Sequence, residues 1–186
     1  MFRNRYLVIF SIFFLLSFFS CEDTPPADDA LQQAVYRDPH SYARAWEARV
    51  KHLSLDLEVN FEEAVIKGTA TLEIEKEENA KMLHLDSRNL VNKSINLSED
   101  DNEKAYRREA NVQIGRVDSI LGEELLIPLD ENTRFVTIRY QTKPGADALQ
   151  FLPKEQTTGT GPFLLTQSQA INARTWLSIQ DRPGLR

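Results

Sequence analysis

Residues His52–Phe61 read HLSLDLEVNF, and this stretch decides the fold class. Every second residue from Leu53 to Phe61 is apolar, and the residues between them are polar. Successive side chains of a strand point to opposite faces of a sheet, so a period of two predicts a strand with one buried face. The alternation resumes at Val65–Ile74 after the turn Glu62–Ala64, so the two segments are predicted to pair as an antiparallel hairpin.

Further along the chain, five more segments combine strand-like patterns with flanking turn-forming residues. They are Lys81–Leu85, Val91–Leu97, Val112–Val117, Glu124–Leu129 and Arg134–Thr142. Phe163–Gln169 is a further candidate that leads into a turn at residues 170–174. No segment has the period of a long helix. Short strands joined by close turns predict a mainly β domain, built as an antiparallel sheet or sandwich.

The first 21 residues have the composition of an export signal. Two arginines precede the apolar run Tyr6–Phe19, which is shorter than the roughly 18–20 residues of a membrane-spanning helix. The sequence FFSC at residues 18–21 resembles a relaxed bacterial lipobox. We therefore expect residues 1–21 to be a helical lipoprotein signal peptide with Cys21 as its lipidation site. An uncleaved anchor and a buried strand are the alternatives.

Residues 22–35 are polar and contain Pro25-Pro26 and two adjacent aspartates, which predicts a flexible tether. The folded domain is then expected at residues 36–186. These expectations place the protein in a bacterial cell envelope, attached to a membrane through lipid on Cys21. Cys21 is also the single cysteine of the chain, so no disulfide is expected and packing alone must stabilise the domain.

The chain lacks the sequence motifs of several hydrolytic and binding chemistries. No His-Glu-x-x-His, Gly-x-Ser-x-Gly or glycine-rich phosphate loop occurs. His84 and Asp86 face the same side of a predicted strand but have no third or fourth metal ligand, so a surface or hydrogen-bonded role is favoured over a metal site. A net charge of -6 without a basic stripe argues against a nucleic-acid partner.

The segment TQSQAINAR at residues 166–174 carries side chains suited to binding a peptide end. Gln167 and Gln169 would project to one side if the segment were extended. A primary amide offers both a carbonyl acceptor and an NH2 donor, so such a pair can hold a free ammonium group and a peptide backbone. From the spacing alone, an ordinary polar loop is the simpler interpretation.

Six blocks of sequence together carry a family resemblance. They are DPHSYA at residues 38–43, HLSLDL at 52–57, KGTATL at 67–72, LHLDS at 83–87, ALQFL at 148–152 and QSQAINAR at 167–174. In order and spacing they resemble the N-terminal domain of M1 zinc aminopeptidases, most closely the leukotriene A4 hydrolase-like branch. The resemblance covers residues 36–186 and implies a saddle-shaped, mostly antiparallel β domain.

The resemblance also implies a function for the glutamine segment. Gln169, together with Gln167 and Ser168, would bind the amino end of a peptide substrate. Zinc would be present in the full-length enzyme, in a catalytic domain followed by a helical C-terminal domain, both beyond Arg186. We therefore expect a C-terminally incomplete, substrate-binding part of an envelope-anchored M1 metalloaminopeptidase that binds no metal and is inactive alone. The alternative is a non-catalytic β-sandwich lipoprotein that binds peptides or envelope partners.

Overall fold

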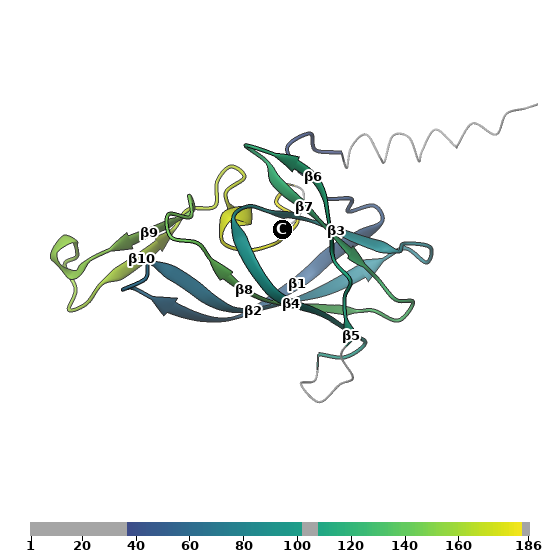
Figure 1. Cartoon of the computed structure of the whole chain (residues 1–186), viewed down its shortest axis with the longest axis horizontal. Coiled ribbons are helices and arrows are strands. Elements are labelled where there is room, and N and C mark those ends of the chain that lie inside the picture. The colour runs from purple at the N-terminus through teal and green to yellow at the C-terminus, as the bar shows by residue number, and fades with distance from the viewer. Residues whose placement is uncertain (1–36, 102–107, 184–186) are drawn as a thin grey trace, which may run out of the picture.

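The computed structural model describes residues 37–101 and 108–183 (Figure 1). The predicted signal peptide at residues 1–21, with its lipidation site Cys21, and the predicted tether at residues 22–35 lie outside the described residues. Among the described residues, no helix is long and apolar enough to cross a membrane.

Antiparallel strands dominate the described chain. The elements are β1 (Ala48–Asn60), β2 (Val65–Lys76), β3 (Met82–Ser87), β4 (Leu90–Ser98), β5 (Arg108–Glu109), β6 (Gln113–Asp118), β7 (Gly122–Pro128), β8 (Phe135–Thr142), β9 (Leu149–Leu152), the 3-10 helix η1 (Lys154–Gln156), β10 (Phe163–Thr166) and the 3-10 helix η2 (Ala173–Thr175). They form a five-stranded sheet in the order β1-β2-β8-β4-β5, a three-stranded sheet in the order β3-β7-β6, and the β9–β10 ribbon. This confirms the mainly β, antiparallel fold, including the β1–β2 hairpin.

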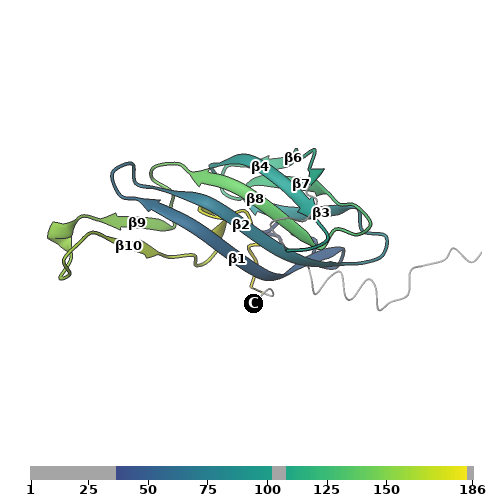
Figure 2. The same cartoon turned by 90° about the horizontal axis from the view of Figure 1, so that it is seen from below.

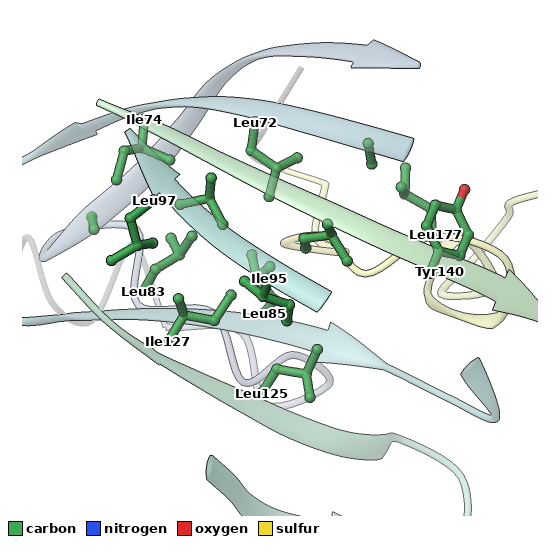
Figure 3. Packing of buried hydrophobic residues seen from close by; sticks show 14 residues of the cluster. Leu72, Ile74, Leu83, Leu85, Ile95, Leu97, Leu125, Ile127, Tyr140 and Leu177 are labelled. Carbon is green, nitrogen blue, oxygen red and sulfur yellow. The ribbon is translucent and has the colours of Figure 1, made fainter. Parts of the chain in front are cut away.

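The five-stranded and three-stranded sheets pack face to face around one hydrophobic core (Figure 2, Figure 3). In the larger sheet, Leu72 pairs with Val136, which in turn pairs with Leu97, so their side chains share the inner face. In the smaller sheet, Leu83 pairs with Ile127. All five are at most 2% exposed. Each such side chain contributes roughly 1.5–3 kcal/mol through burial, so this layer stabilises the sandwich.

The first strand, β1, is only partly covered because it lies at the edge of its sheet. Leu53 and Leu57 pack against the core. Leu55, Val59 and Phe61 are each more than a third exposed, although they belong to the same alternating pattern. The predicted strand is therefore confirmed, and its apolar face extends beyond the core that the described residues supply.

Strand β3 differs from the others because almost all of it is buried on both faces. Leu83 and Leu85 point into the core, as their alternation predicts. His84 and Asp86 point to the opposite face, yet they are only 5% and 0% exposed. Hydrogen bonds join His84 to Glu124 on the neighbouring strand β7. They join Asp86 to the first and last described segments, which hold the candidate site in place.

Candidate substrate-binding loop

The predicted binding residues lie in a loop that follows β10 directly (Figure 1). The loop begins where the Gln167 backbone N–H donates to the Ala148 carbonyl at 2.8 Å, at the end of the β9–β10 ribbon. Residues 169–172 form a turn that runs into η2. The turn expected at residues 170–174 is therefore confirmed, and it sets the direction of the glutamine side chains.

Gln167 and Gln169 are both exposed, but they are not the parallel pair that an extended segment would give. The side-chain oxygen of Gln167 folds back and accepts a hydrogen bond from the Gln169 backbone N–H at 3.0 Å. The Gln169 carbonyl accepts one from Asn172 Nδ2 at 3.2 Å. The peptide bond between Gln169 and Ala170 is cis. The backbone of this turn is thus held by its own side chains.

Ser168 faces the interior of the loop rather than its open side. Its hydroxyl accepts a hydrogen bond from the indole N–H of Trp176 at 3.1 Å, and its carbonyl accepts one from the Asn172 backbone at 2.9 Å. Ser168 is half-buried between two exposed glutamines. Its position indicates that it braces the loop and leaves the exposed surface to Gln167 and Gln169.

Arg174 is the buried anchor of the loop, with a side chain that is 0% exposed. Its Nε donates to Asp181 Oδ2 at 3.1 Å, and its Nη1 lies 3.5 Å from Asp86 Oδ1. Its remaining N–H groups reach the backbone carbonyls of Leu121, at 3.0 Å, and His40, at 2.8 Å. One guanidinium therefore fastens the loop to the smaller sheet and to the start of the domain.

Asp86 completes this buried network from strand β3. Its carboxylate accepts hydrogen bonds from the Ser41 hydroxyl at 2.5 Å, the Tyr42 backbone at 2.7 Å and the Asp181 backbone at 2.9 Å. Burial raises the pKa of Asp86 above its usual value, although these hydrogen bonds and Arg174 act in the opposite direction. Asp86 is therefore a structural junction between the chain's first and last described segments.

His84 joins a separate buried cluster rather than a metal site with Asp86. Its Nδ1 lies 2.8 Å from Glu124 Oε1. Arg116 donates to the other carboxylate oxygen of Glu124 at 3.0 Å. Burial by itself raises the pKa of Glu124, but the hydrogen bonds from Arg116 and His84 outweigh it and lower that pKa to about 2. The hydrogen-bonded interpretation of His84 is the one that fits this geometry.

The zinc implied by the resemblance finds no fitting site in the described part of the chain. Within residues 37–101 and 108–183, no group of three or more His, Cys, Asp or Glu side chains could hold a metal ion. No chemical step through zinc is therefore derived from these residues.

Two residues that support the loop were not predicted as site residues. Trp176 holds Ser168. Gln180 donates to the Ala48 carbonyl and accepts from the Val50 backbone, which fixes the loop's far end against a bulge in β1. A tryptophan and a glutamine in an irregular segment give no periodic signal, so the pattern of the sequence could not single them out.

The fold and the site define an antiparallel β-sandwich domain that displays a braced, glutamine-bearing loop at one end. The family model described as the Peptidase M1 N-terminal domain matches residues 39–186. The chain belongs to the M1 peptidase family, as an N-terminal domain.

Relatives with similar sequences are known enzymes of this family. Leukotriene A-4 hydrolase of Xenopus laevis is 31% identical over 156 residues, which cover 80% of this chain and 24% of that protein. Leucine aminopeptidase 2 of Saccharomyces cerevisiae is 32% identical over 143 residues, covering 74% and 20%. The chain thus spans about a quarter of the length of the curated relatives that it matches.

Solved structures give the same answer. Yeast LTA4 hydrolase in complex with Bestatin is 26% identical, with a TM-score of 0.69 over 86% of this chain and 25% of that one. Native leukotriene A4 hydrolase from Saccharomyces cerevisiae is also 26% identical, with a TM-score of 0.70 over 82% and 24%. The predicted family is therefore confirmed by sequence and by structure.

Proposed function

We propose that this chain is the substrate-binding N-terminal part of a zinc aminopeptidase held in a bacterial cell envelope by lipid on Cys21. Membership of the M1 family supports the peptidase activity, and leucine aminopeptidase 2 is among the relatives. Zinc and the groups that act on the scissile bond belong to the catalytic domain, outside the described residues. The partners are therefore a peptide substrate, the catalytic and C-terminal domains, and a membrane.

The side chain of Gln169 is the observation that carries this proposal. It is exposed at the tip of a braced turn, and its amide has no hydrogen-bond partner among the described residues. A carboxamide oxygen accepts hydrogen bonds from an ammonium group without requiring a charged partner. Gln169 is thus available to accept a hydrogen bond from the free amino end of a peptide.

Gln167 has a complementary capacity. Its carboxamide oxygen is already occupied by the Gln169 backbone N–H. Its NH2 group is left to donate, which suits a backbone carbonyl of the substrate. The two glutamines would therefore recognise different groups of one peptide: Gln169 the ammonium and Gln167 a carbonyl.

The buried network behind the loop explains how these side chains keep their position. Positioning of substrate groups lowers a reaction barrier only if the positioning groups are themselves held within fractions of an ångström. Arg174 and Trp176 hold the side of the loop that faces the domain, through buried or half-buried hydrogen bonds. The loop is therefore pre-organised to hold a peptide end before the catalytic domain acts on it.

The test is the variant Gln169→Ala in the complete aminopeptidase, assayed with amino-acid anilides. A hydrogen bond to a charged group contributes about 1.5–3 kcal/mol, so kcat/KM is expected to fall roughly 10- to 150-fold, mostly through KM. Gln113→Ala, which changes an exposed glutamine on β6, is the matched control and should leave kcat/KM unchanged. If Gln169→Ala and Gln113→Ala had the same kcat/KM, Gln169 would not be part of the binding site.

A further inference from the structure

An exposed apolar rim follows the outer edge of the smaller sheet. Ile114, Val117 and Ile120, on β6 and the turn that follows it, are 53%, 69% and 66% exposed. Strand β6 is the outer strand of its sheet, and all six of its residues are exposed. β-Branched apolar side chains clustered on one exposed strand and turn mark a contact surface.

The turn presents these side chains in a fixed geometry. The Asp118 carboxylate accepts hydrogen bonds from the backbone N–H groups of Ile120, at 2.7 Å, and Leu121, at 2.8 Å. Gly122 follows with a φ of 80°, and its Cα packs so closely against the Ser87 carbonyl that a Cβ would not fit. Ile120 is therefore held outward by a rigid turn.

A groove of about 860 Å³ borders this turn. Its lining residues include the three arginines Arg37, Arg44 and Arg116, together with Asp38, Trp46 and Leu121. Arg116 lies over the ring of Tyr42, 4.7 Å from its centroid. Arginine and tryptophan beside an apolar rim are the side chains that favour the region where lipid headgroups meet acyl chains.

The chain enters the domain at this groove, because Arg37 is the first described residue and lines it. Only 15 residues separate Cys21 from Arg37. Fully extended, they span at most roughly 55 Å, so lipid on Cys21 would hold the point where the chain enters the domain within that distance of the bilayer.

We propose that the tether face, defined as β6, the β6–β7 turn and residues 37–46, lies against the membrane surface that holds the lipid anchor. This inference rests on the proposed lipidation of Cys21. The β9–β10 ribbon points away from this face in both views (Figure 1, Figure 2). The glutamine loop itself lies beside the tether face, because its anchor Arg174 donates to the carbonyls of His40 and Leu121.

The test measures membrane depth in the lipidated chain, reconstituted in vesicles of phosphatidylethanolamine and phosphatidylglycerol. With Cys21 blocked by lipid, Ile120→Cys gives a unique thiol for a spin label, and Val117→Cys gives a second one in case the first disturbs the turn. Phe163→Cys on β10 is the matched control, because Phe163 is also apolar and is 54% exposed. The measured quantity is the ratio of the label's collision rate with oxygen to its collision rate with a water-soluble nickel complex. This ratio should be severalfold higher for labels at 117 and 120 than for the label at 163.

The mass of the purified chain, measured on the same sample, reports lipidation separately. If the chain is lipidated but the labels at 117 and 120 are as accessible to the nickel complex as the label at 163, the tether face does not contact the membrane. The proposed lipid anchor would be unaffected by that result. An unmodified Cys21 would overturn the proposed anchoring, and the inference that rests on it would fall as well.

Discussion

Replacement of Arg174 by alanine tests whether one buried guanidinium holds the candidate substrate-binding loop to the domain. The substitution leaves the carboxylates of Asp86 and Asp181 in the interior without their cation. It also deprives the His40 and Leu121 carbonyls of their donor. Removing one partner of a buried ion pair typically costs 3–5 kcal/mol, and the two additional carbonyls place this variant in the upper half of that range, at about 4–5 kcal/mol.

Urea unfolding followed by tryptophan fluorescence measures this loss, since Trp176 lies two residues after Arg174. With an m-value of about 2 kcal/mol/M, in the middle of the usual range for urea, the midpoint is expected to fall by roughly 2 M. Arg174→Lys keeps the positive charge but loses the planar guanidinium that bonds several partners at once, so the decrease in its free energy of unfolding should be intermediate. Arg134→Ala is the control, because that side chain is 65% exposed and 3.8 Å from Glu73; its stability should change by about 0.5 kcal/mol at most. If Arg174→Ala unfolded at the same midpoint as this control, the anchoring argument would be refuted.

Two other predictions concern the hydrogen-bonded clusters. The folded pKa of Glu124 is about 2, below its ordinary value, so its ionised form stabilises the fold above about pH 4.5 and loses that effect as the pH falls toward 2. Between these limits the wild type should lose up to about 3 kcal/mol more than Glu124→Gln, and parallel stability curves would contradict the role of the Arg116 contact. Trp176→Phe removes the donor to Ser168; we expect a loss of about 0.5–1.5 kcal/mol and a higher KM in the complete enzyme, whereas an unchanged KM would show that this brace does not position the loop.

The strands could be predicted because burial of one face leaves a period of two in the sequence. The long segments His52–Phe61 and Arg134–Thr142 carry this period over many residues, and both form strands. Strands β5 and β9 have only two and four residues, so the same signal is too short to detect. Their pairing is decided by neighbours that the local sequence does not reveal.

The turn that carries the candidate site residues could be predicted from the sequence, but its hydrogen bonds could not. A strand over Phe163–Gln169 leading into a turn was expected; the strand ends earlier, at Thr166, and the turn follows at residues 169–172. The fold-back of Gln167 and the inward position of Ser168 depend on hydrogen bonds that no spacing rule specifies. Asp86 was compared with His84 because they are neighbours on one strand, whereas its true partner, Arg174, lies far along the chain.

The long reach of Arg174 has a consequence for how the domain is made. Its bond to His40 joins residues 134 positions apart, and the bond from Gln180 to Ala48 joins residues 132 positions apart. The N-terminal part of a chain leaves the ribosome first. The segment around His40 is therefore made long before Arg174, its hydrogen-bond partner, has been synthesised. Because closing so long a loop is entropically costly, we expect it to be a late step of folding, and substitutions at either end should slow folding more than they disturb early sheet formation.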